Sequence, residues 1–341
     1  KDWVFLKSHS NYKGREFFFP FDKDTIKEKY ILKLLKDDYD NPRYLKHAAI
    51  RFLLRSMYLN LNKSSIQGYS MLIHTAGKTM DHEEDKKVID SLLDKLRNKD
   101  QRVIGELIKI ANDLFHDQEI VNRLCLDILR FIGMNQVLVI NNKNKDQDKV
   151  LRACQPEVLF TFAIGGNIVS RGLTFENLLT FFFSRTVKGK MQQNTYIQRA
   201  RMFGNRPYAK CFELCVPEAL FKTWASCFEQ HELSLVSAKA GNYVHIQSKA
   251  TSAADPSSID EQHVLNEKSG ERAVGSIFEY SEEIDRRLCS NASDPLSIIR
   301  GLQEDGLIPK DAFPDPMMFY IEQRSKSKNA VLMVLRQDGS G

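Results

Sequence analysis

Residues 159–186 read LFTFAIGGNIVSRGLTFENLLTFFFSRT, and NTYIQRARMFGNR (194–206) and YAKCFELC (208–215) follow them. Two apolar runs in this stretch, Leu159 to Ile164 and Leu178 to Phe183, are short, rich in β-branched and aromatic residues, and bounded by glycine or charge. Such runs are typical of strands buried on both faces of a parallel sheet. A loop with glycine, arginine and hydroxyl side chains separates them, and a second arginine cluster comes later, an arrangement that suits contact with phosphate groups.

Strands and helices alternate on both sides of this stretch. We expect strands at 70–75, 137–140, 159–164, 178–183 and 208–215, and helices at 44–59, 147–153 and 193–203. Residues 82–132 have the apolar spacing of two or three amphipathic helices, which is more than one crossover needs. The sequence therefore predicts an α/β fold, with a mainly parallel sheet flanked by helices and a helical insertion.

Beyond Cys215 the pattern changes, and we expect a smaller C-terminal extension of mixed α+β structure. It would hold an amphipathic helix over 217–235, short helices over 277–288 and from Asp294, and a hairpin of 317–323 with 331–336. The predicted organisation is an aromatic-rich lead-in with a helix packing on the central domain (1–62), the central domain with its insertion at about 82–132 (63–215), an appended coupling or docking domain (216–338), and a tag remnant (339–341).

Composition narrows the classes of function. The chain has 341 residues, 42% of them hydrophobic, and a net charge of +5, so contact with nucleic acid would have to come from local clusters. No apolar run approaches the length of a membrane span, and no signal-peptide pattern opens the chain, which lacks an initiator Met and is interpreted as a fragment. The six cysteines are scattered without a zinc-ligand spacing, so we expect buried thiols and a cytoplasmic location.

The central stretch resembles the second RecA-like domain of superfamily-two helicases, with SRGLTF as the fifth motif and QRARMFGNR as the sixth. It is more similar to the Z-one domain family, the C-terminal part of DEAD-type helicase-like subunits of bacterial ATP-dependent restriction and phage-defence systems. SMLIH at 70–74 fills the place of the fourth motif, and Ala200 stands where the family usually has glycine. The matching residues are Gly165, Gly166, Asn167, Ser170, Arg171, Gly172, Leu173, Thr174, Arg185, Gln198, Arg201, Phe203, Gly204 and Arg206.

The resemblance implies a RecA-like ATP-dependent DNA translocase or helicase-like subunit in which this part supplies arginines to an ATP site. Arg201 is the first candidate for the catalytic arginine, and Arg199 and Arg206 stay open as alternatives. An arginine acting across a domain cleft can raise a phosphoryl-transfer rate by ~10³ to 10⁵. The other expected contacts are Gln198 to phosphate or water, Arg171, Gly172 and Thr174 to the cofactor, and Ser170, Arg171, His74, Thr75 and Asn167 to the DNA backbone.

Each of these residues also has an ordinary structural interpretation. Arginines on a helix are usually solvated or in weak salt bridges, and we expect Arg51 and Arg55 to lie on such a solvated face. His74 fits a satisfied loop histidine, and the three phenylalanines at 181–183 fit a core.

The sequence lacks parts that an ATPase needs. It has no GxxxxGK[ST] loop, because Leu72 stands five positions before the Gly77–Lys78 pair, and no Asp-Glu pair follows an apolar strand to hold Mg²⁺. ATP and Mg²⁺ are therefore expected in the full-length protein, at Walker motifs in an absent N-terminal RecA-like domain, with no metal ligand from this chain. Alone it should be inactive as an ATPase and is not expected to be a nuclease.

The expected partners are the double-stranded DNA backbone, the N-terminal RecA-like domain, and a nuclease or DNA-recognition subunit of a restriction complex. No membrane is expected. The alternative is a non-catalytic RecA-like scaffold that binds a nuclease partner, and a nucleotide hydrolase using the Ala76–Thr79 loop is disfavoured.

Overall fold

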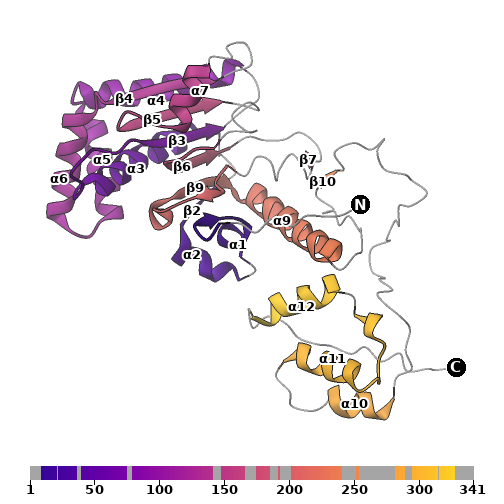
Figure 1. Ribbon diagram of the computed structural model, residues 1–341. Coiled ribbons are helices and arrows are strands. Elements are labelled where there is room, and N and C mark those ends of the chain that lie inside the picture. Colours follow the sequence, from indigo (N-terminus) through magenta and orange to yellow (C-terminus); the bar gives the residue numbers. More distant parts are fainter. Residues whose placement is uncertain are drawn as a thin grey trace. The chain divides into compact units, whose positions relative to one another are not determined.

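The computed structural model describes residues 9–20, 22–36, 40–74, 79–140, 147–165, 174–184, 191–192, 201–239, 251–252, 281–288, 294–313 and 315–326. The chain divides into two compact units (Figure 1). The first comprises Lys1–Pro20 and Asp24–Ala225, and the second comprises Phe21–Lys23 and Ser226–Gly341.

Six parallel strands form the central sheet of the first unit. Their bounds are β2 (Ile31–Leu35), β3 (Tyr69–His74), β4 (Asn135–Ile140), β5 (Phe160–Gly165), β6 (Leu178–Phe183) and β9 (Glu213–Pro217), and their order across the sheet is β2-β9-β6-β3-β5-β4. All five pairings are parallel, which places every carboxyl strand end at the same edge. The two-residue strands are β1 (Tyr12–Lys13), β7 (Met191–Gln192), β8 (Gly204–Asn205) and β10 (Thr251–Ser252), and β1 pairs antiparallel with β8.

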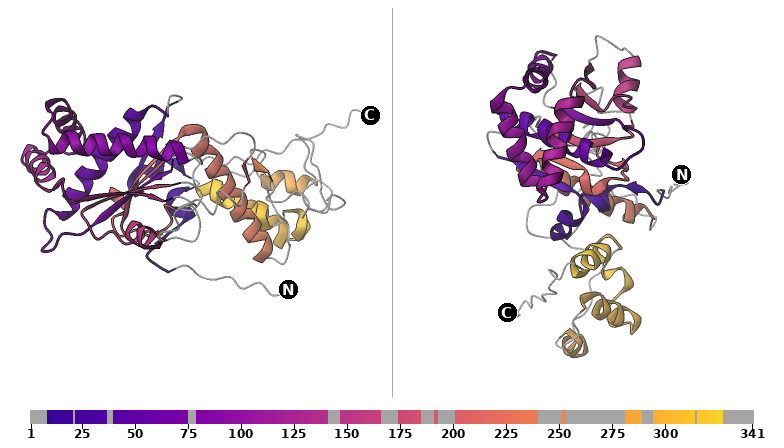
Figure 2. Two further views of the ribbon diagram at one scale, coloured as in Figure 1. Left: turned by 90° about the horizontal axis from the view of Figure 1, so that it is seen from above. Right: turned by 90° about the vertical axis from the view of Figure 1, so that its left-hand side faces the viewer.

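Helices cover both faces of this sheet, which is seen between them in Figure 2. Helices α3 (Pro42–Asn60) and α4 (Thr79–Arg97) pack on one face, whereas α7 (Gln147–Cys154) and the start of α9 (Glu218–Lys239) cover the other. Alternation along β6 separates the two sides: Phe182 joins the core under α3, and Phe183 packs on the ring of Trp224 at 5.0 Å between centroids. The sheet flanked by helices is the α/β, RecA-like arrangement that the sequence predicts.

Two further helices extend the crossover between β3 and β4. They are α5 (Gln101–Leu114) and α6 (Gln118–Phe131), and each begins at an aspartate whose side chain accepts hydrogen bonds from two backbone N–H groups. Leu107 of α5 and Leu124 and Ile128 of α6 are fully buried in the core that α3 shares. The helical insertion predicted for 82–132 is therefore confirmed as α4 to α6.

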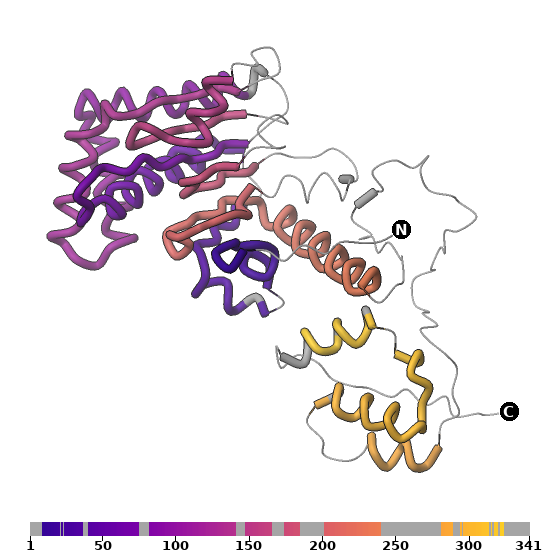
Figure 3. Tube along the Cα trace, viewed as in Figure 1, coloured from indigo at the N-terminus to yellow at the C-terminus, as the bar shows by residue number. Residues whose placement is uncertain are grey.

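The lead-in contributes directly to this sheet, as the indigo part of Figure 3 shows. It contains α1 (Arg15–Phe18), a 3₁₀ turn (Lys23–Thr25), α2 (Ile26–Lys29) and the edge strand β2, which pairs with β9 in register from Ile31↔Glu213. Phe18 is buried against Tyr30, whose hydroxyl donates to the Phe18 carbonyl at 2.8 Å. The sequence did not predict this strand.

The described part of the second unit is mainly helical, with the two-residue strand β10 as its only described strand. Helices α10 (Glu282–Leu288), α11 (Pro295–Glu304) and α12 (Asp315–Lys326), with a 3₁₀ turn at Lys310–Ala312, surround a small core of Ile284, Ile299, Leu302, Ile308 and Ala312. The predicted start of a helix at Asp294 is confirmed by its cap. The predicted strand over 317–323 is wrong, because these residues lie in α12 and place Met318 and Ile321 against that core at helical spacing.

In the described residues, no helix has the length and apolar character that crossing a bilayer requires.

Candidate functional site

His74 joins three strands at the carboxyl edge of the sheet. It ends β3, its Nδ1–H donates to the carbonyl of Gly165 at the end of β5 (2.9 Å), and its ring stacks on Phe183 at the end of β6 (4.6 Å between centroids, 22° between planes). The backbone N–H of Ser184 donates to the backbone carbonyl of His74 at 3.3 Å. Since the side chain is only 2% exposed, it fixes the points where three loops leave the sheet and does not present itself to DNA.

Arg206 lies near the opposite edge. The residue is 4% exposed, and its guanidinium donates to the carbonyls of Phe175 (2.8 Å), which precedes β6, and of Arg201 (3.0 Å). Burial lowers the pKa of Arg206 to about 10, a shift that the nearby Tyr12 phenol opposes. A guanidinium so enclosed is a structural cation in this conformation.

Arg206 brings the backbone of Arg201 close to the backbone that follows Thr174. Thr174 is exposed and adjoins Phe175, so one guanidinium holds the backbones of both predicted nucleotide-contact segments. The Arg201 side chain is half-buried, and burial lowers its pKa, a shift that the neighbouring Cys154 thiol opposes. A cation held partly away from water interacts more strongly with an incoming phosphate than a fully hydrated one.

The structure does not bring His74 together with these residues. His74 is in register with Phe183, the last residue of β6, whereas Phe175 comes three residues before its first, Leu178. A strand of six residues spans roughly 16 Å at ~3.3 Å per residue, so the two groups lie at opposite ends of the sheet.

Several predicted site residues lie outside the described residues. They are Thr75, Asn167, Ser170, Arg171, Gly172, Gln198 and Arg199, together with Gly77 and Lys78 of the loop after β3 and most of the helix predicted at 193–203.

A buried ion cluster was missed from the sequence. Glu213, at the start of β9, is fully buried and accepts from Arg51 at 2.8–3.0 Å and from Arg55 at 2.6 Å. Burial alone would raise the pKa of Glu213, but the two arginines outweigh it and lower the pKa to about 2. The expectation that Arg51 and Arg55 lie on a solvated face is therefore wrong, and the signal was a single carboxylate inside the apolar run FELCV.

A second polar cluster ties the loop after α3 to the segment after Arg206. The ammonium of Lys63 donates to the hydroxyls of Tyr69 (2.7 Å) and Tyr208 (3.0 Å) and also to Gln67. The hydrogen bond from Lys63 lowers the pKa of Tyr208. This cluster fixes Tyr208, and with it the strand that follows.

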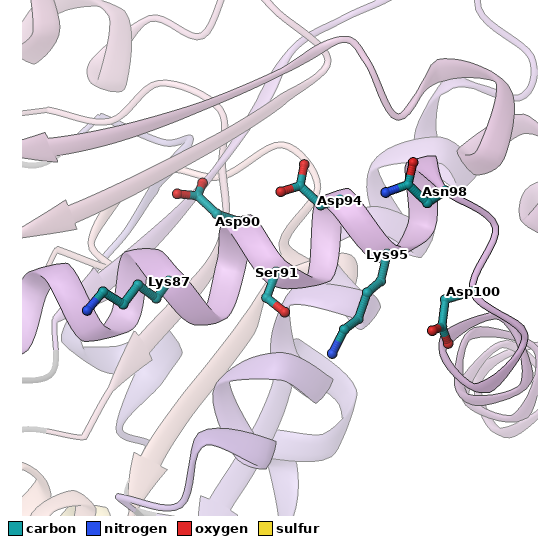
Figure 4. Close-up of a pocket in the computed structure, with 7 residues that line it drawn as sticks. All are labelled: Lys87, Asp90, Ser91, Asp94, Lys95, Asn98 and Asp100. Carbon is teal, nitrogen blue, oxygen red and sulfur yellow. The ribbon is translucent and has the colours of Figure 1, made fainter.

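An open hollow of about 560 Å³ runs along α4 to the start of α5, and Figure 4 shows the side chains that line it. Asp90, Asp94 and Asn98 lie along one side of the helix, and Lys87, Ser91 and Lys95 lie along the other. Asp90 and Asp94 are paired within the helix, with Lys86 at 2.7 Å and Arg97 at 2.6 Å, as is usual for a solvated helix face.

Four of the cysteines, Cys125, Cys154, Cys215 and Cys227, are buried free thiols as predicted, and Cys211 is partly exposed. Among the described residues, no three histidine, cysteine or acidic side chains are arranged to hold a metal ion.

Comparison with known proteins places this geometry in a family. The family model of the Z1 (Z-one) domain matches residues 44–249, more than half of the chain, from α3 to a point beyond the end of α9. No curated protein matches the chain.

Proposed function

The chain belongs to the Z1 domain family, and from that premise we propose that it is the C-terminal motor part of an ATP-dependent DNA translocase or helicase-like subunit of a restriction or defence complex. In this proposal the ATP cradle belongs to an N-terminal RecA-like domain, and this chain supplies one wall of the site. Arg201 carries the positive charge, and Thr174 contributes a hydroxyl.

One observation carries the proposal. The segments that hold Thr174 and Arg201 are far apart in the sequence, yet a single buried guanidinium bonds the carbonyls of Phe175 and Arg201 at 2.8 and 3.0 Å. An exposed hydroxyl and a half-buried arginine thereby share one end of the sheet. Arginine suits phosphate oxygens because its planar fork stays charged and donates in two directions.

The described residues fit ATP as one wall and not as a cradle. Bound ATP and its Mg²⁺ would supply the γ-phosphoryl group, and the Walker motifs of the N-terminal domain would hold both. Arg201 would neutralise charge that develops during phosphoryl transfer, since its guanidinium stays charged and Arg206 holds its backbone carbonyl at 3.0 Å. Gln198 and Arg199 would extend the same wall.

We assign DNA contact to residues that follow β5 and β3 in the chain. Ser170, Arg171, Asn167 and Thr75 belong to the loops that follow β5 and β3, whose last residues His74 joins. Such contacts would read the phosphate backbone, so binding should be tolerant of sequence and weaken steeply with salt. A nuclease or DNA-recognition subunit would choose the sequence and cut, docked through residues 216–338.

The experiment is DNA-stimulated ATP hydrolysis by the full-length protein carrying Arg201→Ala, with Arg102→Ala on the exposed face of α5 as the matched control. We expect turnover to fall by roughly 10³ or more while nucleotide binding persists. Both proteins should show the wild-type circular dichroism spectrum.

Unchanged turnover in Arg201→Ala and in Arg199→Ala would overturn the catalytic assignment and favour the non-catalytic scaffold. Hydrolysis by this chain alone, lost on Lys78→Ala, would instead place the cradle within it.

A further inference from the structure

Arg206 has no donor left for a ligand. A guanidinium carries five N–H donors, and here each makes a hydrogen bond to a backbone carbonyl. The acceptors are the carbonyls of Met202 (3.0 Å), Phe175 (2.8 Å), Asn205 (3.0 Å), Arg201 (3.0 Å) and Phe203 (3.2 Å). The Arg206 guanidinium is therefore fully used in bonding backbone carbonyls. A phosphate could bind it only after several of these hydrogen bonds had broken.

Gly204 completes this centre. Its φ of +141° lies in the region that favours glycine, and a Cβ there would lie 3.4 Å from Cζ, Nη1 and Nη2 of Arg206. The glycine thus allows the backbone to turn closely over the face of the guanidinium. A side chain at this position would strain the backbone and press on Arg206.

The lead-in also contacts the segment from Arg201 to Arg206. Tyr12 and Lys13 of β1 pair with Asn205 and Gly204 of β8, and the ring of Phe18 stacks on Phe203 at 5.8 Å. The segment from Arg201 to Arg206 is therefore held from within by one guanidinium and from outside by residues almost 200 positions earlier in the chain.

We propose that Arg206 is a positioning residue and not a phosphate ligand. It ties together the Phe175 backbone, the Arg201 backbone and the β1–β8 ladder, so that the lead-in and this guanidinium together set the place of Arg201. The catalytic consequence rests on the proposed function, whereas the positioning itself does not.

Lysine cannot replace arginine in this role. Its ammonium has three donors at a single point, so at least two of the five carbonyls would lose their partner in Arg206→Lys. A buried carbonyl without a partner is unfavourable, and the loop should open more often. The positive charge at position 206 is unchanged in this variant. A change in exchange would therefore report the lost hydrogen-bond geometry and not a lost charge.

The test is hydrogen exchange on the full-length protein, comparing wild type, Arg206→Lys, Arg201→Ala and the exposed control Arg102→Lys. In Arg206→Lys we expect amides of residues 203–206 and 12–13 to exchange roughly tenfold faster or more, with strands β3 and β5 unchanged. Arg201→Ala and Arg102→Lys should keep wild-type exchange.

Gly204→Ala is a second variant that keeps the arginine, so the proposal stays testable if Arg206→Lys does not fold. It should raise exchange in the same two segments. Wild-type exchange in both variants would overturn the positioning role.

Hydrolysis measured on the same samples separates this proposal from the proposed function. Faster exchange and lower turnover in Arg206→Lys, with normal exchange and lower turnover in Arg201→Ala, would support both. Faster exchange in Arg206→Lys with full turnover in Arg201→Ala would uphold the positioning role and refute the catalytic one. Normal exchange with lost turnover in Arg206→Lys would make Arg206 a phosphate ligand.

Discussion

Replacing Glu213 by glutamine should destabilise the first unit by about 3 kcal/mol at pH 7. The carboxylate is fully buried, and its two oxygens accept from Arg51 and Arg55 at 2.6–3.0 Å. Its pKa falls from the ordinary 4.5 to about 2, and at ~1.36 kcal/mol per pKa unit this is worth about 3 kcal/mol. The value agrees with the ~3–5 kcal/mol typical of removing one partner of a buried ion pair.

The same contribution has a defined pH dependence. Because the folded pKa of Glu213 is lowered, its stabilisation is complete above the unfolded value and is lost as the pH falls from about 4.5 toward about 2. Glu213→Gln should therefore lose less stability than the wild type over this acid range.

The assay is urea unfolding followed by the fluorescence of Trp224, which is fully buried in the first unit, in a Trp3→Phe background. Glu84→Gln, an exposed carboxylate on α4, is the control and should stay within about 0.5 kcal/mol of the wild type. A loss below about 1 kcal/mol in Glu213→Gln, or a wild-type acid dependence, would refute the reasoning.

Three other substitutions test local packing within the first unit. Gly68→Ala should cost more than about 2 kcal/mol, because its Cβ would lie 2.4 Å from the carbonyl oxygens of Pro156 and Val158, and backbone atoms cannot move aside; a neutral result would contradict the close approach. Gly105→Ala, whose Cβ meets nothing within 4 Å on helix α5, should instead stabilise by ~0.5–1 kcal/mol in the same unfolding experiment. Thr180→Val should be neutral or stabilising, since the Thr180 hydroxyl is buried without a hydrogen-bond partner among the described residues, and a measured loss above about 1 kcal/mol would show that this hydroxyl does have a partner.

The apolar pattern of the sequence predicted the interior of the first unit well, because a strand buried on both faces appears in the sequence as a continuous apolar run. The runs around Phe162 and Phe181 are β5 and β6, and residues 82–132, whose apolar spacing predicted two or three helices, form α4 to α6. The edge strand β2 was missed since it is short and partly exposed, with Lys33 in the middle of ILKLL. Its place was decided by pairing with β9, which no local pattern reveals.

The second unit was harder to predict. Residues 317–323 alternate well enough to resemble a strand, but the Asp315–Pro316 start favours a helix, and the core selected the spacing of Met318 and Ile321. In such a small core a few contacts decide between a strand and a helix.

The candidate site was predicted by residue type more accurately than by role. Motif resemblance made Arg201 the first candidate for the catalytic arginine and left Arg206 open as an alternative for the same role, yet Arg201 is half-buried and Arg206 gives all its donors to carbonyls. An arginine motif in a sequence cannot reveal which backbone carbonyls, if any, each guanidinium will bond. Similarly, Arg51 and Arg55 were taken for surface residues because their partner comes more than 150 residues later.

That separation affects how the protein is made. A ribosome adding ~5–20 residues per second needs roughly 8–30 s to pass from Arg51 to Glu213, which are 162 positions apart. Throughout that interval Arg51 and Arg55 of α3 lack their partner Glu213, which has not yet been synthesised. Strand β2 also lacks its partner, because Glu213 belongs to β9. Strands β3 to β6 can pair with one another during this interval, but β2 can join the sheet only once β9 has been made, so the first and last strands of the sheet are completed together.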